Sequence, residues 1–441
     1  MRLFRSSGLW MIPSLLLLNC LLLISCGGDA ADEPADAVTA EVEAEADAPL
    51  SDVPEAQALY DEAMDLLSGD RPGAIAKLRE AIEVDPDFLA AITTASYQLA
   101  WHYQYTDRSE TVKAEALALA ERAEAMDPDH EWSLSALGSY YYRIEKDYDQ
   151  AMAIYDRATQ LYPENLHFLR MGAHVARRQG DWARALEILQ QAESVTPTSE
   201  ALQAIVENHR YNRRWDEMIA AAQNYAQRYP QGTFGPSAMA WGQYFKTGDT
   251  QTIRDFLATQ PAGNLTGTRW TLEMMDGDPA AALAIVDASD TEMFSDQYGI
   301  TPRSYLRGVA LQSLGRQEEA DAALLKARET VEGMLPELDH DCRVHGSLGL
   351  IYAVMGERDA AIQRAQHAVD MIPPEKDALV GPYNVLNLAE VYSLLGEAEL
   401  AVEQIQYLFT IPAPMTRVGL EVRGIWDYIR DHPSFRALLE V

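Results

Sequence analysis

The residues best suited to metal chemistry in this chain lie between positions 339 and 345. The stretch reads Asp-His-Asp-Cys-Arg-Val-His, and carboxylate, imidazole and thiolate groups are common metal ligands. His340 and His345 are five positions apart, however, which is a poor spacing for one helix face. Asp341 is instead typical of a helix N-terminus, where its side chain accepts a backbone N–H bond. We therefore expect a capping segment, with no metal or other cofactor and no nucleophilic role for Cys342.

A second candidate site is a set of basic residues in an otherwise acidic chain. The residues that we select are His167, Arg170, His174, Arg177, Arg210 and Arg214. The first four follow one another at steps of three or four positions, so they share one face of a predicted helix. Basic groups bind carboxylates through charge-assisted hydrogen bonds, which makes an acidic peptide or a terminal carboxylate the matching ligand. The alternative is internal pairing with nearby acids such as Glu200 and Glu207.

Composition limits the classes of protein to which this chain can belong. Its 441 residues include 35 Lys and Arg against 68 Asp and Glu, a net charge of −33. A nucleic-acid-binding protein needs basic surface to contact phosphates, so the acidic balance argues against that class. Hydrophobic residues make up 48% of the chain, which is enough for a packed core.

The N-terminus has the pattern of an export signal. Residues 1–25 carry two arginines and then an apolar run that is too short for a comfortable transmembrane helix. The run ends in Leu-Ile-Ser-Cys at positions 23–26, which resembles the lipobox of bacterial lipoproteins. That resemblance implies cleavage before Cys26 and attachment of lipid, including palmitate, to the protein. The alternative is an ordinary cleaved signal in which Cys26 is incidental.

The segment that follows is predicted to be an extended, disordered tether. Residues 27–54 contain nine acidic residues, eight alanines, three prolines and no basic residue. Such a segment cannot bury enough apolar surface to fold, and its charges repel one another. Together with the lipobox, it predicts a protein of the bacterial cell envelope that is held by lipid, which we expect in the outer membrane facing the periplasm.

The rest of the chain is predicted to be helical and repetitive. An apolar stripe followed by proline occurs three times, as Ala74, Leu78, Ala81 and Pro86; as Ala151, Tyr155, Ala158 and Pro163; and as Ala185, Leu189, Ala192 and Pro197. Later units carry a turn glycine at Gly315, Gly356 and Gly396. Small residues let two helices approach closely, glycine ends the first helix in a left-handed turn, and proline ends the second.

This pattern of small, large and turn positions resembles the tetratricopeptide repeat, a helix-turn-helix unit of about 34 residues. The resemblance implies an all-α superhelical solenoid whose first helices line a concave groove where partners bind. It places the basic residues toward that groove. We also expect no β-sheet, and few contacts between units that are distant in the sequence, because each repeat packs on its neighbours.

The predicted order of segments follows from these observations. They are a lipoprotein signal peptide at 1–25, an acidic tether at 26–54, an N-terminal repeat array at 55–261, an irregular hinge or degenerate repeat at 262–302, a C-terminal repeat array at 303–412 and a capping segment at 413–441. The capping segment is needed because the last repeat would otherwise expose its hydrophobic face.

The sequence predicts a scaffold rather than an enzyme. It contains no P-loop, nucleophile elbow, His-Glu-x-x-His helix or paired-cysteine zinc spacing. The leading hypothesis is a membrane-tethered scaffold that binds a protein or peptide in the groove. The alternative is a non-catalytic accessory or regulatory subunit of an envelope enzyme or export complex.

Overall fold

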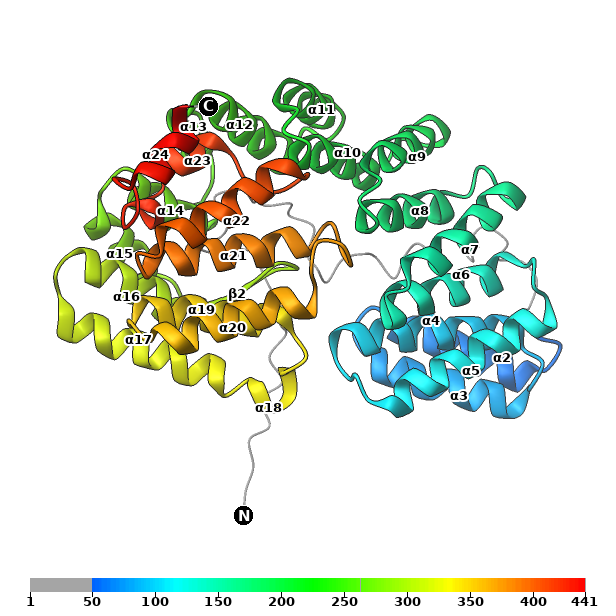
Figure 1. Ribbon diagram of the computed structural model, residues 1–441. Coiled ribbons are helices and arrows are strands. Elements are labelled where there is room, and N and C mark those ends of the chain that lie inside the picture. The colour runs from blue at the N-terminus through cyan, green and yellow to red at the C-terminus, as the bar shows by residue number, and fades with distance from the viewer. Residues whose placement is uncertain (1–49, 262, 441) are drawn as a thin grey trace, which may run out of the picture. The chain divides into compact units, whose positions relative to one another are not determined.

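The computed structural model describes residues 50–261 and 263–440, which form two compact units. The N-terminal unit comprises residues 50–208 and the C-terminal unit residues 209–440, with the boundary inside helix α10 (Ser199–Tyr211). Within each unit, successive helices pack as hairpins (Figure 1). The predicted signal peptide, Cys26 and most of the predicted tether lie outside the described residues.

The N-terminal unit is built from helices alone among its described residues. They are α2 (Pro54–Leu66), α3 (Arg71–Val84), α4 (Leu89–Tyr105), α5 (Glu110–Met126), α6 (Glu131–Tyr140), the π-helical turn η1 (Tyr141–Glu145), α7 (Tyr148–Leu161), α8 (Leu166–Arg178), α9 (Trp182–Val195) and the first part of α10. The hairpins are α2–α3, α4–α5, α6–α7 and α8–α9.

The C-terminal unit continues the same pattern. Its helices are α11 (Trp215–Arg228), α12 (Phe234–Thr247), α13 (Gln251–Ala258), α14 (Thr266–Met275), α15 (Pro279–Asp287), α16 (Arg303–Ser313), α17 (Gln317–Glu332), α18 (Leu335–Leu338), α19 (Cys342–Val354), α20 (Arg358–Met371), α21 (Gly381–Leu394), α22 (Ala398–Thr410), α23 (Arg417–Val422), the 3₁₀ turn η2 (Gly424–Trp426) and α24 (Pro433–Glu440). Two short strands, β1 (Met293–Ser295) and β2 (Ile300–Pro302), lie between α15 and α16.

The predicted all-α fold is confirmed, and the residues that define the repeats act as predicted. Helices α3, α7 and α9 each end two residues before a proline. The turn glycines Gly315, Gly356 and Gly396 adopt φ values of 70°, 78° and 75°, a region that disfavours side chains. The predicted stripe residues of α3 and α7, such as Leu78 and Tyr155, are fully buried. The sequence pattern therefore marked both the helix ends and the packed faces.

The expectation of no β-sheet is wrong at one point. Strands β1 and β2 pair antiparallel, with Phe294 opposite Thr301. The chain reverses between them because Asp296 accepts hydrogen bonds from the backbone N–H groups of Tyr298 (2.7 Å) and Gly299 (2.9 Å). Such an Asx turn is local side-chain chemistry, which a repeat pattern does not reveal.

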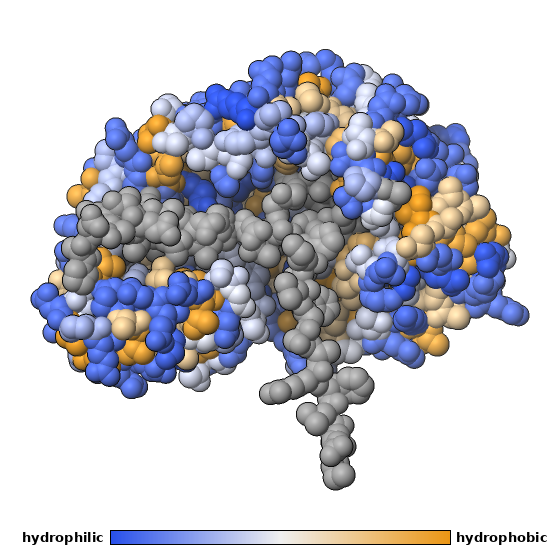
Figure 2. All heavy atoms as spheres, turned by 180° about the vertical axis from the view of Figure 1, so that it is seen from behind, coloured by the Kyte–Doolittle hydropathy of each residue, from blue (hydrophilic) through white to orange (hydrophobic). Residues whose placement is uncertain are grey.

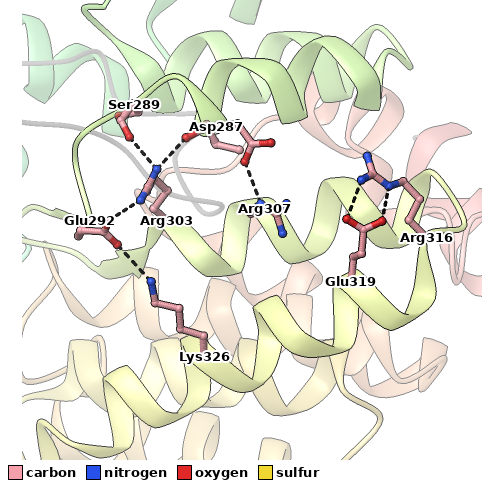
Figure 3. A network of polar contacts seen from close by, with 9 residues as sticks. Asp287, Ser289, Glu292, Arg303, Arg307, Arg316, Glu319 and Lys326 are labelled. Carbon is pink, nitrogen blue, oxygen red and sulfur yellow. Dashed lines mark hydrogen bonds and ion pairs between the residues drawn. The ribbon is translucent and has the colours of Figure 1, made fainter.

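A network of ion pairs holds the segment around these strands against α16 and α17 (Figure 3). The Arg303 guanidinium donates to the backbone oxygen of Ser289 (2.7 Å) and pairs with Glu292. Lys326 on α17 lies 3.7 Å from the same glutamate, and Arg307 donates to Asp287. The described part of the predicted hinge at 262–302 thus contains the hairpin α14–α15 and the strand pair β1–β2, which these ion pairs hold in place. All of these elements belong to the C-terminal unit.

The C-terminal unit also contains contacts between segments that are far apart in sequence, contrary to our expectation. The Tyr211 hydroxyl donates to the backbone oxygen of Leu379 (3.0 Å), and Arg213 donates to the backbone oxygens of residues 408, 411 and 415 at 2.7–3.1 Å. Helix α12 also packs on α23. The end of α10 is therefore buried against the last repeats of the C-terminal unit. This explains why the boundary between the two units falls inside α10 and not at the predicted hinge, residues 262–302.

Candidate functional site

The candidate site is the face of the N-terminal unit that is formed by the first helices of successive hairpins. A hollow lies between α4, α6 and α8, where its lining includes Tyr97, Ser135, Asn165 and His167. Helix α8 starts where it does because the Asn165 side chain accepts the backbone N–H of Phe168 (3.1 Å). This cap fixes the register in which α8 presents its basic residues.

Four of the predicted site residues share α8, and the structure gives them different roles. His167 is buried, and its Nε2 lies 2.9 Å from the Ser135 hydroxyl oxygen. His174 is half-buried. Arg177 is buried and pairs with Glu207 on α10 at 2.9 Å. For Arg177, the alternative of internal pairing therefore describes the structure.

Arg170 differs from the other arginines of α8. It is half-buried, and its Nη2 is buried and has no hydrogen-bond partner among residues 50–261 and 263–440. Arg170 also forms no ion pair with an acid of the described residues, so its positive charge remains available to an acidic group from outside the chain.

The remaining two predicted residues belong to the C-terminal unit. Arg210 is buried, lies over the Tyr211 ring at 4.9 Å and donates to the Tyr383 hydroxyl at 3.3 Å. Arg214 is exposed and precedes α11. Arg210 thus stabilises the interior of its own unit, a role that the sequence pattern did not indicate.

A cluster of arginine and aromatic side chains was missed by the sequence analysis. Arg71, at the start of α3, and Arg143, in η1, lie 5.0 Å and 4.1 Å from the centre of the Trp101 ring. Burial and the positive charge of Arg143 lower the pKa of Arg71. Positions 71, 101 and 143 belong to different hairpins, so no local spacing joins them. The only available signal was that each is a large cationic or aromatic residue near a helix end.

The stretch at 339–345 is a helix cap in the structure. Asp341 accepts the backbone N–H of Arg343 (3.0 Å) and pairs with its guanidinium. His345 is fully buried, with its Nε2 2.7 Å from the backbone oxygen of Asp339, and burial lowers its pKa. Cys342 is also buried. In the part of the chain that the structure describes, no group of three potential ligands is arranged to hold a metal ion.

Figure 2 shows hydrophobic residues in separate groups among hydrophilic ones on the face drawn there. Within the described ranges, no helix combines the length and apolarity that crossing a membrane requires.

Comparison with known proteins identifies the repeat. A family model described as "Tetratricopeptide repeat" matches residues 142–208, from η1 into α10, so the match includes α8. No curated protein sequence matches the chain. The hairpin architecture and this match together make the fold an all-α tetratricopeptide-repeat solenoid.

Solved structures with similar architecture share little sequence with this chain. A tetratricopeptide repeat protein from Parabacteroides merdae is 16% identical, with a TM-score of 0.40, over 53% of this chain and 91% of that chain. PilW, titled a widely conserved type IV pilus biogenesis factor, is 16% identical, with a TM-score of 0.35, over 53% and 90%. Pseudomonas aeruginosa pilF is 19% identical, with a TM-score of 0.35, over 47% and 98%.

Proposed function

We propose that this protein is a lipid-anchored interaction scaffold of the bacterial cell envelope. It binds a protein or peptide along the first-helix face of its N-terminal unit. The observation that carries the binding part is Arg170, whose half-buried side chain forms no ion pair with an acid among the described residues while the chain as a whole is strongly acidic. The Leu-Ile-Ser-Cys string at 23–26 and the acidic segment after it support the anchor.

The partner that this face fits best is acidic. Both exposed arginines among the described residues of the N-terminal unit already pair with acids: Arg79 pairs with Glu115 and Arg157 with Asp129. Arg170 has no such acid among residues 50–261 and 263–440, so a carboxylate from a partner can pair with its guanidinium. His174 lies one turn along α8 and extends the same basic surface.

The first test concerns recognition. Arg170→Glu is expected to weaken partner recovery by about tenfold, because a repelling charge replaces the attracting one at the contact. The measurement is quantitative mass spectrometry of proteins that co-purify with the full chain from native membranes. Arg184→Glu is the matched control, because Arg184 lies on the second helix α9 and pairs with Asp156. Equal recovery with wild type and both variants contradicts the proposed binding face.

A second test concerns the anchor. Cys26→Ala is expected to abolish incorporation of a fatty-acid analogue in metabolic labelling, because the proposed lipid is attached to the protein at that cysteine. Two acyl chains give stable anchoring, at about 0.8 kcal/mol for each buried methylene. Cys20→Ala is the control, because Cys20 lies in the same apolar run but not at the end of the lipobox. Labelling of Cys26→Ala at the wild-type level would rule out this anchor.

A further inference from the structure

We infer that the ends of the second helices α3, α5 and α7 form a separate docking surface for a basic segment of a partner protein that also carries apolar side chains. Four exposed hydrophobic residues define this surface, and we call them the apolar row: Val53, Val84, Met126 and Leu161. Three of them lie on second helices, whereas Arg170 lies on the first helix α8. The inference therefore goes beyond the proposed function and does not depend on it.

The apolar row stands out from the rest of the surface of the described chain. The exposed fraction is 36% for Val84, 39% for Met126 and 46% for Leu161. Among the described residues, eight large hydrophobic side chains are exposed in this way, and the apolar row contains four of them. Single apolar residues scattered over a surface need no explanation, but a group of them marks a site of interaction.

The repeat architecture gives three residues of the row equivalent positions. Val84, Met126 and Leu161 are the last residues of α3, α5 and α7, and each lies two positions before a proline. A side chain at this position meets the solvent at the end of a second helix. Successive repeats therefore expose an apolar side chain at the same place.

Hydrogen bonds between neighbouring repeats bring these helix ends together. The Arg122 side chain, on α5, donates to the backbone oxygen of Pro86 in the turn after α3. The Tyr162 hydroxyl, at the end of α7, donates to the backbone oxygen of Asp129 in the turn after α5 (3.0 Å). The ends of α3, α5 and α7 consequently follow one another along one edge of the N-terminal unit.

The start of the described chain joins the same edge. The Ser51 hydroxyl donates to the Asp85 carboxylate (2.5 Å), and it accepts the backbone N–H of Val53 (3.0 Å). The backbone of Val53 therefore lies close to the end of α3, where Val84 is located. The apolar row thus continues from the end of α7 to the residue that precedes α2.

Uncompensated acidic groups border the apolar row. Four exposed carboxylates there form no ion pair with a base of residues 50–261 or 263–440: those of Glu83, Asp87, Asp127 and Glu164. The nearby Arg157 is already paired with Asp129. The C-terminal end of a helix also carries partial negative charge, and three such ends lie along this edge. The edge therefore combines apolar contacts with negative charge.

This combination selects the occupant. A basic segment is attracted by the carboxylates, and its apolar side chains remove the row from water. Anionic lipid is repelled by the same carboxylates. A second copy of this chain, with 68 acidic and 35 basic residues, brings charge of the same sign, as does its acidic segment at 27–49. The surface therefore fits a basic, amphipathic segment of another protein.

The experiment measures binding of a fluorescein-labelled amphipathic peptide of leucine and lysine to the full chain by fluorescence anisotropy. Met126→Ser combined with Leu161→Ser is expected to weaken binding by about tenfold, because two apolar contacts are lost while the charge is kept. Leu325→Ser combined with Leu400→Ser is the matched control, since these residues are similarly exposed on α17 and α22. The control should bind like wild type, and circular dichroism checks that both variants keep their helical content.

A second pair of variants tests the charge of the edge. Glu83→Gln combined with Asp127→Asn is expected to weaken binding by about tenfold and to reduce its salt dependence. The control is Glu318→Gln combined with Glu329→Gln, which neutralises two exposed acids of α17 that form no ion pair among the described residues. Oligolysine of equal length should bind more weakly than the leucine–lysine peptide, because it lacks the apolar contacts.

Equal affinity of wild type and the Met126→Ser, Leu161→Ser chain for the leucine–lysine peptide would overturn the inferred surface. Equally tight binding of oligolysine would do the same, since charge alone would then account for it. Two further outcomes would assign the row to another occupant: an oligomer that dissociates in this variant during sedimentation, or binding of lipid-free Cys26→Ala protein to phosphatidylcholine vesicles that requires Met126 and Leu161. The proposed function is judged separately, by co-purification with Arg170→Glu.

Discussion

Replacing Arg423 by methionine is expected to lower the free energy of unfolding of the C-terminal unit by about 3–5 kcal/mol at pH 8, because it leaves a buried carboxylate without its counter-ion. Glu390, in the middle of α21, is fully buried, and Arg423 is 6% exposed. Their side chains pair at 2.7 Å. Urea unfolding at pH 8 measures the loss, and hydrogen exchange of the α21 amides assigns it to this unit.

The pair matters because it joins the closing segment to the last repeat. Arg423 directly precedes η2 and lies 6.0 Å from the Trp426 ring. Trp426 is itself fully buried and stacks on Phe435 of α24 at 6.1 Å. The Ser393 hydroxyl donates to the backbone oxygen of Ile425 (2.6 Å), which adds a second link from α21. Loss of the pair should therefore loosen the segment that covers the end of the array.

The cost should depend on pH in a defined direction. Burial raises the pKa of Glu390 to about 7, above its ordinary value of 4.5. The folded chain then binds the proton more tightly than the unfolded chain, so this group stabilises the fold at low pH. That contribution, up to about 3 kcal/mol, is lost as pH rises from about 5 through 7. Glu390→Gln should remove this part of the pH dependence, and Arg423→Met should cost less at pH 5 than at pH 8.

The control for Arg423 is Arg436→Met, which also removes an arginine from the closing region. Arg436 is exposed and pairs with the exposed Asp431, and exposed pairs are worth about 0–1 kcal/mol. If Arg423→Met unfolds at the same urea concentration as Arg436→Met and wild type at pH 8, the pair does not stabilise the fold as argued.

The repeats could be predicted from the sequence because their determinants are local. A glycine with φ near 75° at Gly356 or Gly396, and a proline two residues beyond a helix end, act within a few residues of their own position. Small residues such as Ala158 and Ala185 mark the buried face for the same reason, because they recur at helical spacing. Local signals of this kind can be read without knowing the tertiary structure.

The division into units depends on contacts that no periodicity encodes. Arg213 reaches three backbone oxygens between positions 408 and 415, and the Tyr383 and Tyr298 rings stack at 4.0 Å across 85 residues. The candidate site likewise depends on contacts that the spacing of residues along one helix does not encode. Spacing along α8 identified Arg170, but it could not distinguish that residue from Arg177, which Glu207 of the next repeat neutralises.

The second large loss of stability is expected from the addition of a single methyl group at position 381. Gly381→Ala should lower the free energy of unfolding of the C-terminal unit by about 3 kcal/mol, at the upper end for overpacking. Gly381 begins α21 and is buried against the chain that precedes it. An added Cβ would lie 2.5 Å from the Pro374 Cα and 2.6 Å from the Pro373 carbonyl carbon. These are backbone atoms of two consecutive prolines, so they cannot move aside as a flexible side chain would.

The effect should extend along α21 toward the residues that close the unit. Tyr383, two positions later, accepts a hydrogen bond from Arg210 and stacks on Tyr298. A displaced helix start weakens both contacts, so hydrogen exchange should rise at Tyr383 and at the end of α10 as well as at Gly381. Gly69→Ala is the control, because an added Cβ there meets nothing within 4 Å and its φ is ordinary. That change should alter stability by less than about 1 kcal/mol. If the Gly381 and Gly69 variants have equal stability, the close approach of α21 to Pro373 and Pro374 does not constrain the fold.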